Sequence, residues 1–259
     1  MNTPENGMQT GPLNHGAGVD ALQERSSRAT GGPLFGLRDS GATQQRVPRV
    51  SAGISSRRQI FENSCGAASL LVIAKELGVE KMPAFRGALS SAGDGKLALN
   101  GASEHDLFMI TSGMTTHRRH ANSVVNAGYS MPQHLMFAAR LLGLEADIHQ
   151  QPGMMSAALN RLYPDVRSGL SPDTVIKTSA PRLRDGEYEM KALAVTIGGI
   201  PAGLHWVVRR TDGSFMDPAT GKNAATFDAM RQNMRAESIS FAGYRDTRIS
   251  LVFRRGDAR

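Results

Sequence analysis

The protein has 259 residues, of which 40% are hydrophobic and 20% charged, and its net charge is +7. This composition permits a packed core and excludes wholesale disorder, while the positive charge is too diffuse to indicate nucleic-acid binding. A single cysteine excludes intrachain disulfides and four-cysteine zinc sites, and the absence of any run of 18 apolar residues excludes a transmembrane helix.

The first 50 residues are rich in Gly, Pro and small polar residues and contain no Ile. Such a segment cannot bury enough apolar surface to offset the ~1–2 kcal/mol per residue that ordering costs, so we predict that residues 1–50 are disordered. They also lack the basic start and apolar stretch of a cleavable signal peptide. The segment is either a solvated tail or an export address that a secretion machine and its chaperone recognise.

Residues 51–259 are predicted to form one domain, and its clearest element is a helix over 65–77. Apolar side chains surround nearly the whole of this helix, which is typical of a helix buried in the middle of a domain. Gly78 suits the position after its end, and Ser64 or Asn63 could cap its start.

Further elements follow from capping signals and hydrophobic patterns. A helix is predicted over 132–142, because Ser130 and Gln133 have capping-box spacing and Gly143 suits its end. Residues 84–128 show too little periodicity to predict an element. Another helix is predicted over 154–163, and strands are predicted over 144–148, 191–197, 204–210, 214–217 and 249–253. Helices followed by antiparallel strands indicate an α+β domain.

The only cysteine occupies an unusual position for a core residue. A lone cysteine is usually inert and buried. Cys65, however, stands in the first turn of the predicted helix, where unpaired N–H groups and the helix dipole favour an anion. This setting raises the thiolate fraction, so Cys65 is a candidate nucleophile, with an inert core residue as the alternative.

A nucleophilic thiol needs a base, and the best candidate is His205, which lies in the apolar strand LHWVV beside the only Trp. A buried histidine needs partners for its ring nitrogens, so His205 is either a satisfied core residue or a general base. The other histidines are expected in the tail, in loops or at the surface: His15, His105, His117, His120, His134 and His149.

Hairpin geometry supplies a partner for this histidine. A three-residue loop over 211–213, with Gly213 left-handed in a bulge, pairs Val207 with Asp217. This register places Asp217 on the same face as His205, at ~7–8 Å between backbones. A two-residue loop would put the carboxylate on the opposite face. The hairpin can therefore build the His–Asp half of a Cys–His–Asp triad, although the segment after Asp217 is also an ordinary turn sequence.

Two groups could stabilise the oxyanion of a tetrahedral intermediate. One is the backbone N–H of Cys65, and the other is the side chain of Gln59, six residues upstream. Asn63 is closer in sequence, but it directly precedes the helix and suits a capping role better.

The order of these motifs resembles that of papain-fold cysteine hydrolases, especially C39-like peptidases and the cysteine proteases and deamidases of type III secretion systems. The resemblance rests on Gln59 six residues before Cys65-Gly66, on His205-Trp206 in a strand, and on Asp217-Pro218 after a hairpin. It implies a papain-like fold with Cys65 as nucleophile, His205 as base, Asp217 as orienting acid and Gln59 in the oxyanion hole. No cofactor or metal is expected.

These features favour a cysteine protease, delivered as a bacterial effector into a host cell and acting on host proteins. A glutamine deamidase or another amidase toxin would use the same triad. A non-catalytic binding module is a third possibility, in which basic pairs dock an acidic partner. Otherwise these pairs lie on solvated faces; they are Arg57-Arg58, Arg118-Arg119 and Arg209-Arg210.

Overall fold

The computed structural model describes residues 54–82, 95–114, 128–162, 165–238 and 241–256, all within one compact unit, Thr43–Arg259. The predicted disorder of residues 1–50 lies outside the described residues. Within them, helices combine with a seven-stranded sheet, so the structure is α+β, as predicted. Among the described helices, none has the length and apolar character that crossing a bilayer requires.

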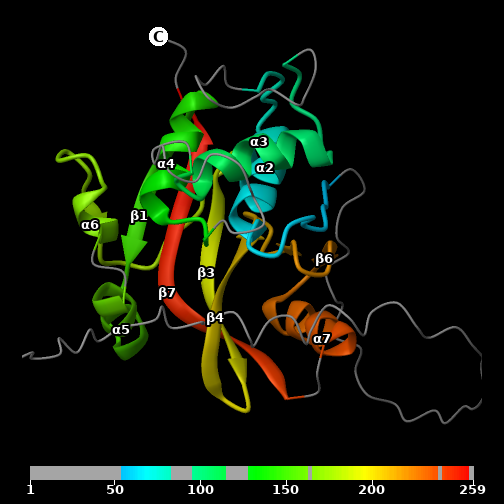
Figure 1. The fold of residues 1–259 in the computed structure, drawn as a ribbon, viewed down its shortest axis with the longest axis vertical. Helices are drawn as coiled ribbons and strands as arrows, with labels where there is room; N and C mark the ends of the chain where they lie inside the picture. Colours follow the sequence, from blue (N-terminus) through cyan, green and yellow to red (C-terminus); the bar gives the residue numbers. More distant parts are fainter. Residues whose placement is uncertain (1–53, 83–94, 115–127, 163–164, 239–240, 257–259) are drawn as a thin grey trace, which may run out of the picture. The chain divides into compact units, whose positions relative to one another are not determined.

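All three predicted helices and all five predicted strands are present, and Figure 1 shows their arrangement. The helices are α2 (Cys65–Glu76), α3 (Gly101–Thr111), α4 (Pro132–Leu141), α5 (Met154–Leu162), α6 (Asp165–Ser168) and α7 (Phe227–Glu237). The strands are β1 (Leu144–Gln150), β2 (Ile176–Lys177), β3 (Tyr188–Ile197), β4 (Ile200–Arg209), β5 (Phe215–Asp217), β6 (Lys222–Ala224) and β7 (Ala242–Arg255). Elements α3, α6, α7, β2 and β6 lie where none was predicted.

The sheet has the strand order β2-β1-β7-β3-β4-β5-β6 and is antiparallel except for the β1–β2 pair. In Figure 1 the long strands β7 and β3 run side by side through its centre. Alternation along β4 sends Trp206 and Val208 into the core beneath α2, and Val207 into the second core, which contains α7. Helices α2 and α7 therefore cover opposite faces of the sheet.

Helix α2 lies in the middle of the domain, as its apolar circumference predicts. All ten residues from Cys65 to Ala74 are buried. Gly78 adopts a φ of +74° after the helix, where its N–H donates to the Lys75 carbonyl and the next N–H, of Val79, donates to the Ala74 carbonyl. These two bonds form a Schellman motif, so the predicted stop signal is correct.

The capping predicted for α4 is wrong in detail. The N-cap is Met131 in extended conformation, with no side-chain capping bond, and Pro132 takes the first helical position. Ser130 lies one residue too early to cap, and its hydroxyl donates instead to Thr111 Oγ1 at 2.8 Å. The proline and Leu135 are buried, so tertiary packing together with the preset proline φ explains why the helix begins here.

Helix α3 lies within the segment that showed no periodicity. Its N-cap is Asn100, whose side chain accepts from the Ser103 N–H at 2.9 Å. Because Glu104 and Asp106 are buried along with apolar neighbours, the buried face of this helix is partly polar. A hydrophobic pattern cannot reveal such a face.

Candidate active site

The β4–β5 hairpin has the predicted register. Val208 pairs with Met216 and Arg209 with Phe215, which continues the ladder to Val207 opposite Asp217. Gly213 has a φ of +84°, so the three-residue loop with a left-handed glycine is confirmed. The structure therefore brings Asp217 to the same side of the hairpin as His205.

The imidazole and the carboxylate meet directly. His205 Nε2 lies 2.7 Å from Asp217 Oδ1, and both side chains are almost completely buried. The same oxygen accepts from the Ala219 N–H at 2.9 Å, while the hydroxyl of Tyr244 donates to Oδ2 at 3.1 Å. Donors thus occupy both carboxylate oxygens, which fixes Asp217 as an acceptor facing the ring.

Cys65 is the first residue of α2, and it is 2% exposed. The first intrahelical hydrogen bond runs from the Ala68 N–H to the Ser64 carbonyl at 2.9 Å. The N–H groups of residues 65–67 therefore have no acceptor within the helix. Ser64 or Asn63 was expected to cap this helix; Ser64 is the N-cap residue, but its side chain makes no capping bond.

Both Asp217 and Cys65 raise the pKa of His205. Burial alone lowers the imidazole pKa, but the charge of Asp217, its hydrogen bond, and a hydrogen bond with Cys65 outweigh burial and raise the pKa of His205 to about 10. Since Nε2 faces Asp217, Nδ1 is the ring nitrogen left for the sulfur. At neutral pH the ring is therefore an imidazolium, with Asp217 and Cys65 as its two partners.

The start of α2 packs closely against the strand that carries His205. A Cβ at Gly66 would collide with Ser130 Cβ and would lie 3.2 Å from Trp206 Cδ1. The indole Nε1 of Trp206 donates to the Ser130 carbonyl at 2.9 Å, and Ser69 Oγ donates to the Trp206 carbonyl at 3.3 Å. These contacts fix the residues adjacent to the two candidate catalytic side chains.

Gln59 lies in the loop that leads into α2. Its Nε2 donates to the carbonyls of Phe61 at 2.9 Å and Glu62 at 2.6 Å, and its backbone N–H donates to the Pro218 carbonyl at 2.8 Å. The backbone bond to Pro218 thus joins the loop to the turn after Asp217. The side-chain amide could donate to an oxyanion only if its bond to the Phe61 or the Glu62 carbonyl opened. A donor role for Gln59 stays a prediction.

Tyr244 of β7 is a site residue that the sequence analysis missed. Its ring stacks on the His205 imidazole with centroids 5.3 Å apart and an interplanar angle of 18°. Burial and the charge of Asp217 raise the pKa of Tyr244 well above its ordinary value, so the hydroxyl stays protonated as a donor. The hydrophobic pattern of β7 gave no sign of this role, because a half-apolar tyrosine is a common strand residue.

We expect Tyr244→Phe to lower the rate of Cys65 acylation by p-nitrophenyl acetate about threefold to tenfold, because Asp217 Oδ2 loses its donor while the ring still stacks. Stopped-flow release of p-nitrophenol measures this rate. Tyr188→Phe is the matched control, since Tyr188 hydrogen-bonds to Glu76, away from His205. Equal rates in Tyr244→Phe and wild type would show that the hydroxyl has no influence on the site.

The other described histidines lie on elements other than β4. His105 is on α3 beside Phe61, and His134 is on α4. His149 was expected at the surface, but it is buried in β1 with Nδ1 2.9 Å from the Ser179 carbonyl. Residues 15, 117 and 120 lie outside the described residues. Within the described ranges, no cluster of His, Cys, Asp and Glu could hold a metal ion.

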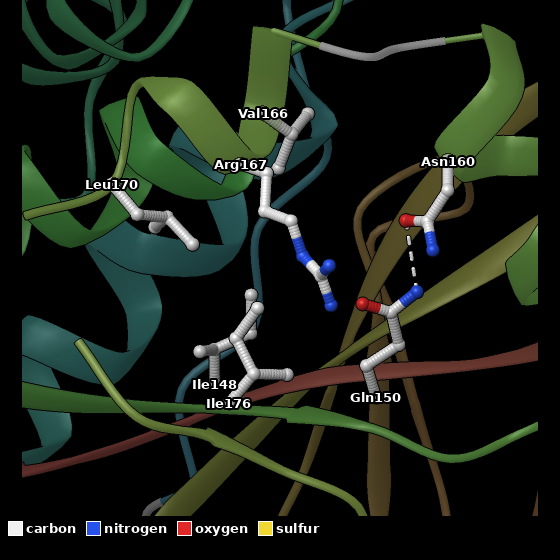
Figure 2. A pocket seen from close by; sticks show the side chains of 7 residues that line it. All are labelled: Ile148, Gln150, Asn160, Val166, Arg167, Leu170 and Ile176. Carbon is white, nitrogen blue, oxygen red and sulfur yellow. Dashed lines mark hydrogen bonds between the residues drawn. The ribbon is translucent and has the colours of Figure 1, made fainter. Parts of the chain in front are cut away.

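A separate cavity of about 270 Å³ lies beside β1, and Figure 2 shows its lining. Arg167 points toward Gln150, whose Nε2 donates to Asn160 Oδ1 at 2.8 Å. The strand order places β7 and β3 between β1 and β4, so this cavity belongs to a different part of the sheet from His205. Its lining residues are Ile148, Gln150, Asn160, Val166, Arg167, Leu170 and Ile176.

Comparison with known proteins gives two findings and one absence. Residues 57–255 match the family model described as "Invasion plasmid antigen J, cysteine protease". A relative, "Cysteine protease IpaJ" of Shigella flexneri, is 41% identical over 201 residues, which is 76% of this chain and 77% of that protein. No solved structure matches. The matches favour a protease over a deamidase, another amidase or a non-catalytic module.

Proposed function

The chain belongs to the Invasion plasmid antigen J family of cysteine proteases and is therefore a thiol hydrolase, and from this we propose that Cys65, His205 and Asp217 form its catalytic triad. The observation that carries the proposal is the 2.7 Å hydrogen bond between His205 and Asp217, with the only sulfhydryl group of the chain as the other partner of the ring. A thiol, a base within hydrogen-bond reach and a group that orients the base are what nucleophilic catalysis requires.

Acylation begins from the thiolate–imidazolium pair. The Cys65 thiolate attacks the carbonyl carbon of the scissile peptide, a C–S bond forms, and the carbonyl electron pair moves onto oxygen. When the tetrahedral intermediate collapses, the C–N bond breaks and the His205 imidazolium gives its proton to the departing amine. Asp217 holds the ring in place through Nε2, so that Nδ1 carries the proton that is transferred.

Deacylation reverses the roles of the same groups. Neutral His205 takes a proton from water, the resulting hydroxide attacks the thioester carbonyl, and the thiolate leaves as the carboxylic acid product forms. In both steps the oxyanion lies near the start of α2, where the Cys65 N–H has no intrahelical acceptor. We propose the Cys65 N–H as one donor and the Gln59 amide as the second.

We further propose that the arrangement is papain-like. A buried helix begins at the nucleophile, the base lies in a strand of an antiparallel sheet, and the acid follows a tight hairpin in the chain order Cys, His, Asp. The separation of 140 residues between Cys65 and His205 supports this assignment, because the Cys and His of papain-like proteases have a similar separation.

We propose that the protein acts as a secreted bacterial effector on proteins of a host cell. The relative from Shigella flexneri is a cysteine protease, and a polypeptide is therefore the expected substrate. The polar composition of residues 1–50 suits a segment read by a secretion machine and bound by a chaperone. Neither nucleic acid nor a cofactor has a role in this proposal.

We expect iodoacetamide to alkylate Cys65 at least about tenfold faster than it alkylates glutathione at pH 6, because His205 stays protonated below about pH 10 and stabilises the thiolate. The sign follows from the raised pKa of His205: its positive charge persists through neutral pH and disappears only as the pH rises through about 10. Intact-mass kinetics between pH 4 and 10 measure the reaction, and the single cysteine makes the adduct unambiguous.

Urea-unfolded protein is the control for this experiment, since unfolding separates the sulfur from His205 while keeping the same thiol. A native rate equal to that of glutathione at pH 6 would contradict the proposed ion pair.

A further inference from the structure

Glu104 is a buried carboxylate outside the triad, and its hydrogen-bond and ion-pair partners lie in the segment that precedes Cys65. It belongs to the first turn of α3, and its side chain is 0% exposed. Oε2 lies 2.6 Å from both Nε and Nη2 of Arg57. This ion pair also corrects the expectation that the Arg57-Arg58 pair lies on a solvated face, because the Arg57 side chain is only 10% exposed.

The other carboxylate oxygen holds the segment between Gln59 and Cys65. Oε1 accepts from the Ile60 N–H at 2.7 Å and from Ser64 Oγ at 2.6 Å. One carboxylate therefore binds the residue after the candidate oxyanion donor and the residue directly before the nucleophile. Three short, charge-assisted hydrogen bonds and the ion-pair contact with Nη2 define the path of the loop strongly.

The contact with Ser64 has a consequence for the start of α2. A serine at an N-cap position normally accepts from the N–H of the second or third helical residue. Here the Ser64 hydroxyl donates to Glu104 and makes no capping bond. The N–H groups at the start of α2 thus keep their capacity to bind an anion that forms at Cys65.

We propose that Glu104 is a positioning residue for the oxyanion hole: it fixes the 57–64 loop so that the N–H of Cys65, which has no acceptor within the helix, points at the developing oxyanion. This inference rests on the proposed triad and adds a residue that does not touch the substrate. It predicts that loss of Glu104 slows one reaction of the Cys65 sulfur, acylation, and leaves another, alkylation, unchanged. Acylation by an ester passes through an oxyanion, whereas alkylation by iodoacetamide does not.

The chain offers a matched control at the other end of the same helix. Glu76 is also a carboxylate on an arginine, with 9% of its side chain exposed and with Oε1 and Oε2 each 2.8 Å from Arg210 nitrogens. It also accepts from a backbone N–H, that of Ser55, at 3.0 Å. It lies about 16 Å along the helix from Cys65, at 1.5 Å per residue. Loss of a buried ion pair is common to both sites, but proximity to the nucleophile is not.

We expect Glu104→Gln to lower the acylation rate of Cys65 by p-nitrophenyl acetate about tenfold to 100-fold, less than the ~10²–10³-fold loss caused by removing an oxyanion donor itself. The rate of alkylation by iodoacetamide and its pH profile should stay within twofold of wild type, because the His205–Asp217 pair is untouched. Glu76→Gln should change neither rate by more than twofold. Stopped-flow release of p-nitrophenol and intact-mass kinetics measure the two reactions, with Cys65→Ala as background.

Three results would overturn the proposal: an unchanged acylation rate in Glu104→Gln, a parallel fall in alkylation and acylation, or an equal acylation loss in Glu76→Gln. If Glu104→Gln does not fold, Ser64→Ala decides, because it removes the 2.6 Å bond to Oε1 and, besides that, only the contacts of the Ser64 hydroxyl with the backbone of Phe61. An unchanged acylation rate in Ser64→Ala then refutes the role of Glu104. Failure of the triad itself is distinguishable, since wild-type protein would show no acylation above Cys65→Ala.

Discussion

Replacing Cys65 with alanine is expected to abolish proteolysis, with a loss of about 10⁴-fold or more, because removing the nucleophile of a triad costs nearly as much as removing the whole triad. The chain contains no second cysteine that could take over. Incubating the protein with host-cell lysate and identifying new protein N-termini by mass spectrometry measures the activity. Wild-type protein should generate cleavages that Cys65→Ala does not.

The matched control for this variant is Lys75→Ala, which changes an exposed residue near the end of the same helix. Cys65→Ala should itself stay folded, since alanine is smaller than cysteine and has high helix propensity. Thermal unfolding midpoints within a few degrees of wild type would show this. Cleavages that persist in folded Cys65→Ala would contradict both the nucleophile and the thiol mechanism.

The chemistry-bearing half of the site was predictable because local geometry determines it. The turn residue Gly213 selects a three-residue loop, and the period of two along each strand then decides which face Asp217 occupies. In the same way, apolar residues all around 65–77 predict a buried helix, so Cys65 was expected in the first turn of that helix. Both inferences use contacts between residues that are close in sequence.

The supporting half could not be predicted, because its partners are far apart in the chain. Tyr244 reaches Asp217 across 27 residues, and Glu104 binds Ser64 across 40 residues. A lone tyrosine or glutamate has no local signature of such a contact. The buried charge of Glu104 also explains why no helix was predicted over α3, because it interrupts the apolar face that reveals an amphipathic helix.

The second large effect concerns the base. We expect His205→Ala to lower the acylation rate of Cys65 by p-nitrophenyl acetate at pH 7 about 10³-fold or more, because the sulfur loses the cation that keeps it ionised and the leaving group loses its acid. Stopped-flow release of p-nitrophenol measures this rate. His149→Ala is the matched control, since His149 is an equally buried strand histidine whose ring bonds to a backbone carbonyl. Similar losses in both variants would argue against a special role for His205.

Asp217→Asn should cost far less, about tenfold, because an amide oxygen can still accept from His205 Nε2, as the asparagine of papain-like enzymes does. The Ala219 N–H, 2.9 Å from Oδ1, requires an acceptor at that position and so favours the amide oxygen facing the ring. The negative charge is nevertheless lost, and it is the main influence that raises the pKa of His205 to about 10. The imidazolium of Asp217→Asn therefore loses its proton at lower pH, and the alkaline limit of acylation should shift from about 10 toward neutrality. A loss as large as that of His205→Ala, or an unshifted alkaline limit, would contradict an orienting and charge-stabilising role for Asp217.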